Sequence, residues 1–284
     1  MSVKIISDSA SDISQDYAKK LGVRIIPLQF RFSDGEYFDG IDMSNEEFYR
    51  RLENEEELPK TSQISPYRYS EVFKEETADG SEAVYLSISS GVSGSMQSAM
   101  LAAQEFDGKV KVFDSHHFCI SLRVLVEYAK RLADEGKSAD EIVESLNEAL
   151  KKVRIIAVFA TLENLRKGGR LSSASAFVGE LLAIKPMITI KDCGVEVLGN
   201  ARGMKKGIKA MRDYIESEQI DLSMPYAFAY SGSDRENIET FIAENGDLYD
   251  GKTDVEVSYV GATVGTYAGP GAIATAYCLP KTPG

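Results

Sequence analysis

Two short runs rich in hydroxyl side chains are the segments of this sequence best suited to hold a ligand. One is Ser89-Ser90-Gly91-Val92-Ser93-Gly94-Ser95, which follows an apolar stretch ending at Ile88, and the other is Thr61-Ser62-Gln63-Ile64-Ser65-Pro66. Hydroxyl and backbone N–H groups at the start of a helix can bind an anionic group. Either run can also be an ordinary helix start, with Ser65 as N-cap and Pro66 as the first helical residue.

A catalytic interpretation of the first run is the alternative. Gly91-Val92-Ser93-Gly94-Ser95 differs by one residue from the Gly-x-Ser-x-Gly nucleophile elbow, and Asp114, His116 and His117 follow later in the chain. Ser93 with His116 or His117 would make a serine hydrolase or thioesterase. Against this, the last residue of the motif is Ser rather than Gly, and Asp114 is too near His116 in sequence to orient it easily.

Composition limits the remaining classes of function. The chain has 284 residues, of which 43% are hydrophobic and 27% charged, so we expect about two globular domains. With a net charge of -12 and no basic stripe, nucleic acid is not an expected partner. No segment has the form of a signal peptide or a membrane helix, so we expect a cytoplasmic protein without stable membrane insertion. The spacing of its Cys, Asp and Glu residues predicts no metal site, and no Walker or Rossmann glycine pattern predicts a nucleotide cofactor.

The elements that must position the two runs alternate between strand and helix in the first half of the chain. Expected strands lie at 3–6, 23–32, 82–88 and 110–113, and expected helices end at Gly22, start at Ser44, and lie at 96–106, 122–132 and 139–150. This alternation predicts a parallel sheet covered on both faces. Asp34-Gly35 predicts a tight hairpin turn with positive φ, and Ser44 with Glu47 predicts a capping box.

The second half has a different rhythm. Segments 187–190 and 195–198 flank Lys191-Asp192-Cys193-Gly194, which predicts an antiparallel hairpin. Further strands are expected at 155–160, 226–230, 255–260 and 272–278, and helices at 203–217 and 235–245. We place the domain boundary near residue 152, which gives domains of 1–152 and 153–284.

Several segments together resemble the DegV family, fatty-acid-binding proteins that include the FakB subunits of a bacterial fatty-acid kinase. In order along nearly the whole chain they are Asp8-Ser9-Ala10-Ser11-Asp12, 61–66, 89–98, Asp114-Ser115, 162–171, Ile184-Lys185-Pro186 and 265–271. Each segment alone is weak evidence, and their joint order and spacing are specific.

The resemblance implies an α/β fold with an N-terminal three-layer α/β/α domain, whose sheet is mainly parallel, and a C-terminal α/β domain with a mixed sheet. It also implies a long-chain fatty acid such as palmitate as the ligand, with no cofactor and no catalytic activity. The family's carboxylate contacts map onto Thr61 and Ser93, with Gly94 beside them. Arg170 is a candidate for facing a phosphate or a fatty-acid kinase. A carrier of another amphiphile is a further alternative.

Two departures from the family pattern bear on the ligand. Tyr267 stands where the family usually has His, so it can donate one hydrogen bond to a head group but cannot carry a positive charge. Ser121 and Arg123 stand where the family tends to have glycines, which would narrow or reshape the pocket.

Overall fold

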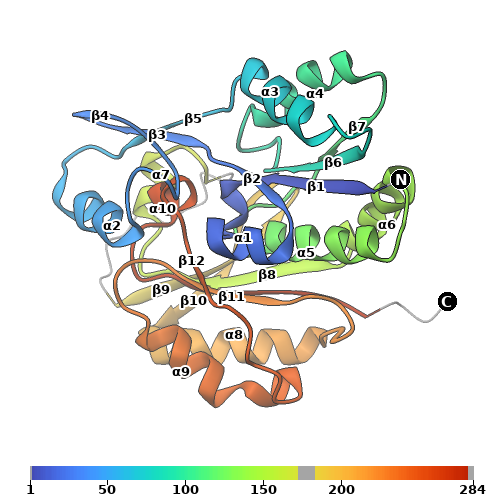
Figure 1. The fold of residues 1–284 in the computed structure, drawn as a ribbon. Coiled ribbons are helices and arrows are strands. Elements are labelled where there is room, and N and C mark those ends of the chain that lie inside the picture. The colour runs from blue at the N-terminus through green and yellow to red at the C-terminus, as the bar shows by residue number, and fades with distance from the viewer. Residues whose placement is uncertain (1, 172–182, 281–284) are drawn as a thin grey trace.

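The computed structural model describes residues 2–171 and 183–280, and its helices and sheets are stacked in layers (Figure 1). A first sheet has the order β2-β1-β6-β7 with all strands parallel. Its strands are β1 (Val3–Asp8), β2 (Arg24–Ile26), β6 (Glu82–Ser87) and β7 (Val110–Asp114). One face carries α3 (Pro66–Glu76), α4 (Ser95–Ala103) and η2 (Gln104–Phe106), and the other carries α1 (Gln15–Leu21), α5 (Ile120–Asp134) and α6 (Ala139–Leu150). The expected three-layer α/β/α arrangement is confirmed.

The second sheet is mixed, as expected. Its order is β10-β9-β8-β13-β11-β12, with antiparallel pairs except for β11 and β12. The strands are β8 (Val153–Val158), β9 (Ile184–Lys191), β10 (Gly194–Arg202), β11 (Ala227–Tyr230), β12 (Ser258–Tyr259) and β13 (Ile273–Cys278). On the outer face lie α8 (Met204–Glu218) and α9 (Glu236–Glu244), followed by η3 (Gly246–Tyr249).

Helix α5 lies between the two sheets and packs on both (Figure 1). One buried apolar cluster contains Ile5 of β1, Leu125 of α5 and Ile155 of β8. The two halves of the chain therefore share a continuous core, and the boundary near residue 152 stays a prediction.

A group of small elements closes one end of the stack, at the left of Figure 1. It comprises the antiparallel sheet β4-β3-β5, with β3 (Gln29–Phe32), β4 (Gly35–Phe38) and β5 (Lys60–Ser62), together with α2 (Asn45–Asn54), α7 (Glu163–Lys167), α10 (Ala262–Ala268) and the 3-10 turn η1 (Ser9–Ser11). Helix α10 comes from the second half of the chain and packs against β3, β5 and α2 of the first.

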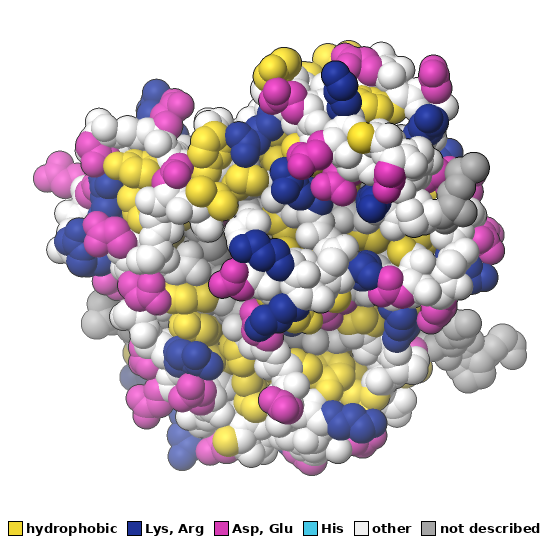
Figure 2. Space-filling model, in the orientation of Figure 1, with side chains coloured by type: hydrophobic (Ala, Val, Ile, Leu, Met, Phe, Trp, Pro, Cys, Tyr) yellow, Lys and Arg dark blue, Asp and Glu magenta, His cyan; other side chains and the backbone are white. Residues whose placement is uncertain are grey.

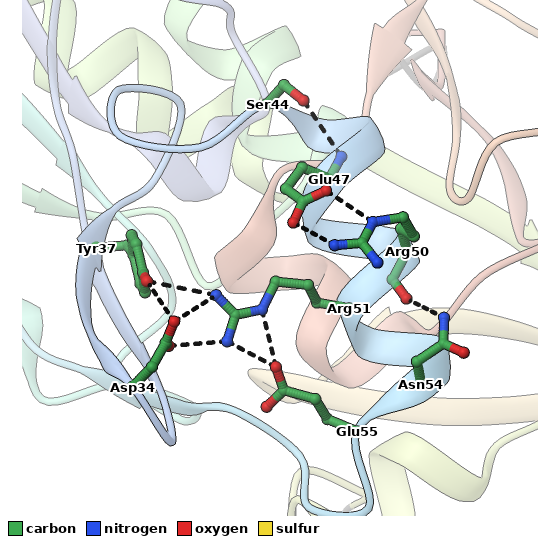
Figure 3. A network of polar contacts seen from close by, with 8 residues as sticks. All are labelled: Asp34, Tyr37, Ser44, Glu47, Arg50, Arg51, Asn54 and Glu55. Carbon is green, nitrogen blue, oxygen red and sulfur yellow. Dashed lines mark hydrogen bonds and ion pairs between the residues drawn. The ribbon is translucent and has the colours of Figure 1, made fainter.

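Arg51 joins α2 to the β3–β4 hairpin (Figure 3). Its guanidinium bonds Asp34 Oδ1 at 2.8 Å and Glu55 Oε1 at 2.6 Å, and it lies 4.0 Å from the ring centre of Phe32. Because the Arg51 side chain is mostly buried, these contacts are less weakened by solvent than those of an exposed ion pair.

Three local predictions need correction. The expected strand at 23–32 is broken at Pro27 into β2 and β3, which belong to different sheets, because proline cannot donate a ladder hydrogen bond. The hairpin turn is Ser33-Asp34, since Phe32 pairs with Gly35, and neither Asp34 nor Gly35 has a positive φ.

Only one of the two hydrogen bonds of a capping box forms at the start of α2. Ser44 Oγ accepts a hydrogen bond from Glu47 N at 3.2 Å, as predicted. The Glu47 carboxylate instead pairs with Arg50, one turn further along the helix (Figure 3).

Candidate ligand-binding cavity

A cavity of about 430 Å³ lies where the first sheet meets α10, α7 and the β9–β10 hairpin. The volume falls within the ~300–1,000 Å³ of small-ligand sites. Much of the lining is apolar and comes from both halves of the chain: Leu28, Ile88, Val92, Phe118, Phe159, Leu165, Ile188, Val195, Val264 and Ala268. The cavity also lies beyond the carboxyl ends of parallel strands, where ligands bind in sheets of this type.

The structure places all five residues assigned to the ligand from the sequence around this one cavity, namely Thr61, Ser93, Gly94, Arg170 and Tyr267. Thr61 Oγ1 and the Tyr267 hydroxyl are 2.6 Å apart, although 206 positions separate them in sequence. One of these two hydroxyl protons makes the bond between them, so the other is available for a ligand. Direct contact of the five residues with a ligand stays a prediction.

The turn that carries Ser93 is fixed by its own backbone. Val92 N and Ser93 N donate to Ser89 O at 3.2 Å, and Ser89 Oγ donates to Cys193 O in the β9–β10 turn at 3.0 Å. Ser93 Oγ donates to Ser95 Oγ at 3.0 Å and accepts from Ser95 N at 3.2 Å. The hydroxyl run of the first half is thus tied to the hairpin of the second.

Gly94 allows the two hydroxyl runs to meet. A Cβ atom at Gly94 would lie 1.9 Å from Gln63 Oε1, so any larger residue would displace that side chain. Gln63 is two residues from Thr61 and also lines the cavity. The polar groups around the cavity therefore form a contiguous set.

Arg170 lies at the exposed rim of the cavity. Its guanidinium is 4.9 Å from the ring centre of Tyr267, and Nη1 donates to Gly168 O at 2.7 Å. Gly169 has a φ of +67°, which glycine adopts without strain and which turns the chain from α7 toward Arg170. A Cβ at Gly168 would lie 2.4 Å from Tyr267 Cδ1, so this position needs glycine for the ring to fit.

Two buried carboxylates hold the start of α10. Asp39 Oδ1 accepts from Ala262 N at 2.8 Å, and Asp39 Oδ2 accepts from Thr263 N at 3.2 Å. Asp12 Oδ1 accepts from Gly261 N at 2.8 Å. Burial raises the pKa of both carboxyls, that of Asp12 to about 8. Neither residue could be assigned this role from the sequence, because 249 positions separate Asp12 from Gly261 and 223 separate Asp39 from Ala262.

The serine hydrolase alternative lacks its base. His117 is buried, burial lowers its pKa to about 3, and its Nδ1 lies 3.1 Å from Ser121 Oγ. His116 Nε2 faces Asp114 Oδ2 at 3.5 Å. Within residues 2–171 and 183–280, the hydroxyl of Ser93 bonds Ser95 and has no histidine partner.

Ser121 and Arg123 are not among the described residues that line the cavity, and their effect on its shape stays a prediction. Ser121 Oγ donates to Phe118 O at 2.7 Å. Arg123 is only 2% exposed and bonds Glu127 Oε1 at 2.7 Å and Glu256 O at 2.8 Å. A side chain at position 123 thus links α5 to the segment before β12.

In the described part of the chain, no group of three or more His, Cys, Asp or Glu side chains is arranged to hold a metal ion. No helix in that part is both long and apolar enough to cross a bilayer. Figure 2 shows acidic and basic side chains interspersed over the face that it draws.

The sequence matches a family model described as "Uncharacterised protein, DegV family" over residues 2–279. A DegV domain-containing protein of Caldanaerobacter subterraneus subsp. tengcongensis is 34% identical over 276 residues, which are 95% of this chain and 96% of that protein. A DegV domain-containing protein of Deinococcus radiodurans is 32% identical over 279 residues, covering 97% and 98% of the two chains.

Solved structures of similar proteins superpose over nearly the whole chain. A DegV family protein of Thermus thermophilus, whose structure is described as showing fatty acid binding, superposes with a TM-score of 0.87 and 32% identity. The match covers 98% of this chain and 100% of the Thermus chain. DegV of Bacillus subtilis, described as a fatty acid binding protein, has a TM-score of 0.84 and 29% identity, covering 99% and 100%. Because family model and relatives match almost from end to end, the chain belongs to the DegV family.

Proposed function

We propose that this protein binds a long-chain fatty acid such as palmitate in the cavity, with the carboxylate near Thr61, Ser93 and Tyr267. The observation that carries the proposal is the lining: a contiguous set of hydroxyl groups beside a surface of apolar side chains. That combination matches an amphiphile with one charged end. The similar Thermus and Bacillus proteins, which are described as binding fatty acids, support the same ligand class.

The tail supplies most of the affinity. Burying ~14 methylenes at ~0.8 kcal/mol each gives a gross gain of roughly 11 kcal/mol before ordering costs. Each hydrogen bond to the charged head adds roughly 1.5 to 3 kcal/mol. The head group therefore mainly fixes the orientation of the ligand.

The protein acts as a carrier in this proposal, without catalytic activity of its own, and presents its fatty acid to a separate fatty-acid kinase. Arg170 supports the second part, because its exposed guanidinium at the cavity rim could meet a phosphate or an acidic group of the kinase. Adding a bacterial fatty-acid kinase and ATP to the loaded protein should yield acyl phosphate. If acyl phosphate does not rise above the kinase-free control, the proposed kinase partnership is wrong, whereas the proposed fatty-acid binding is unaffected.

Native mass spectrometry of protein purified from cells, followed by denaturing extraction, tests the ligand. We expect a mass increment that disappears on denaturation and an extracted long-chain fatty acid. An apo mass, together with no binding of palmitate by delipidated protein, would contradict the proposal. A Ser93-dependent burst with an activated acyl ester would instead favour the hydrolase.

A further inference from the structure

Asp39 is a buried carboxylate that accepts hydrogen bonds from both halves of the chain. It follows β4, is 2% exposed, and is not among the described residues that line the cavity. Its Oδ1 accepts from Ala262 N at 2.8 Å. Its Oδ2 accepts from Thr263 N at 3.2 Å and from the Ser9 hydroxyl at 2.9 Å. Three donors thus converge on the two oxygens of one side chain.

These donors require an acceptor at both oxygen positions of residue 39. An Asn side chain has one acceptor oxygen, and its NH2 group only donates. In either orientation of the amide, that NH2 group would face the N–H of Ala262 or of Thr263. Position 39 therefore needs a carboxylate, and a negative charge is also favourable at the start of a helix.

Helix α10 depends on acceptors outside itself. It has seven residues, and a helix of this length is not stable alone. Gly261 precedes it and supplies no side-chain cap. Asp39 accepts the N–H groups of the first two residues of the helix, so it takes the place of the missing cap.

The placement of α10 decides where one of the cavity hydroxyls lies. The helix carries four of the residues that line the cavity, among them Tyr267. The Tyr267 hydroxyl is 2.6 Å from Thr61 Oγ1. Because Tyr267 is five residues beyond Ala262, only ~7.5 Å along the helix axis, a shift of the helix start displaces this hydroxyl.

The same carboxylate is connected to a second wall of the cavity. The N–H of Asp39 donates to Leu28 O at 2.9 Å, and Leu28 lines the cavity. Leu28 N in turn donates at 3.0 Å to the hydroxyl of Ser9, which bonds Asp39 Oδ2. Asp39 therefore holds α10 in a fixed relation to the segment between β2 and β3.

We propose that Asp39 is a positioning residue for the ligand head group. By holding the start of α10, it sets the place at which the Tyr267 hydroxyl meets the ligand. The inference rests on the proposed fatty-acid binding, and Asp39 acts in it only through α10.

A double-variant cycle of palmitate affinity, measured by titration calorimetry on delipidated protein, separates this role from a general loss of structure. Tyr267→Phe should weaken binding about tenfold, because the head group loses a hydroxyl. Asp39→Asn should weaken binding severalfold. The loss in the double variant should stay below the product of the two single losses, since Asp39→Asn has already displaced the hydroxyl. A double-variant loss within about twofold of that product would overturn the role of Asp39.

The position of Tyr267 can also be followed without a ligand, by NMR of delipidated protein labelled with 13C-tyrosine, in which Tyr267→Phe assigns the signal. That signal should shift in Asp39→Asn, or in Asp39→Ala if the first variant does not fold. Asn245→Ala is the matched control and should leave the signal in place, because Asn245 is 3% exposed and bonds Phe241 O at the end of α9. An unshifted Tyr267 signal in a folded Asp39 variant would overturn the inference, whereas no palmitate binding by the wild type would overturn the proposed function.

Discussion

Single residues at the polar part of the cavity differ in the charge that they can offer a ligand. Thr61, Ser93 and Tyr267 are neutral donors, while the cation Arg170 stands at the exposed rim. Hydrogen bonds from neutral donors to a buried carboxylate orient it without neutralising its charge. The affinity contribution of each donor can therefore be tested by removing one hydroxyl at a time.

Ser93→Ala and Thr61→Ala should each weaken palmitate binding by roughly 1 to 3 kcal/mol, because the carboxylate loses a donor. Titration calorimetry at one pH measures the change. Ser145→Ala is the matched control, since its hydroxyl bonds Glu141 O on the exposed surface of α6. Unchanged affinity in both cavity variants would remove these residues from the site.

Tyr267→His tests the departure from the family pattern. Imidazole with a pKa of ~6.5 gains a positive charge as pH falls, so the variant should bind palmitate increasingly tightly relative to wild type below about pH 6.5. The measurement is the ratio of the two affinities between pH 5.5 and 8. A constant ratio would mean that position 267 does not contact the head group.

At the level of elements, the short helices α7 and α10 lie next to each other, and both line the cavity. Asn164 Nδ2 donates to Thr266 O at 3.1 Å, and the ring of Tyr267 lies against the backbone of Gly168. The position of Tyr267 therefore depends on a glycine in a different element.

Gly168→Ala should displace the Tyr267 ring and weaken palmitate binding severalfold, because the new Cβ would lie 2.4 Å from Cδ1. Its φ of -78° suits alanine, so the effect is a steric one. Gly199→Ala is the control, with nothing within 4 Å of the new Cβ. Equal affinities for the two variants would argue that Tyr267 is not held in place by α7.

The sequence predicted the long elements better than those that build the cavity. The hairpin at Asp192-Cys193 was recognisable from the two strand-like segments that flank it, and in the structure both residues adopt the positive φ of a tight turn. Strand β5 and helices α7 and α10 are too short for a periodic pattern, and the contacts that stabilise them come from distant parts of the chain. The two hydroxyl runs were recognisable from the sequence itself, whereas the individual contact residues came from the family resemblance. Neither source indicated the support that Asp39 and Gly168 give to the site.

For the molecule as a whole, α10 and the buried carboxylates join the two halves of the chain. Asp12 of the first half bonds Gly261 of the second, and Ser258 Oγ donates to Asp12 O at 2.8 Å. The cavity takes lining residues from both halves, so it exists only when they are folded together.

Asp12 should make stability depend on pH. Burial is the main cause that raises its pKa to about 8, whereas the unfolded chain loses this proton near the ordinary value of 3.8. Between these two pKa values unfolding releases a proton. The contribution of Asp12 to the free energy of unfolding is therefore full below about pH 4, and it is lost as pH rises toward 8, by up to ~1.4 kcal/mol per pH unit.

Asp12→Asn should flatten that part of the pH profile of the unfolding free energy, measured by denaturant titration between pH 4 and 8. Asp107→Asn is the matched control, because Asp107 has a similar left-handed backbone, with φ of +48°, and an exposed carboxylate. Parallel profiles for wild type and Asp12→Asn would contradict the buried, proton-retaining state of this residue.

A crystal structure of the delipidated protein soaked with palmitate tests the central claim most directly, because it locates both ends of the ligand. We expect the carboxylate within hydrogen-bonding distance of Thr61, Ser93 or Tyr267 and the tail along the apolar lining between the two sheets. Palmitate bound elsewhere, or with its tail toward the hydroxyl groups and its carboxylate among the apolar side chains, would contradict the account.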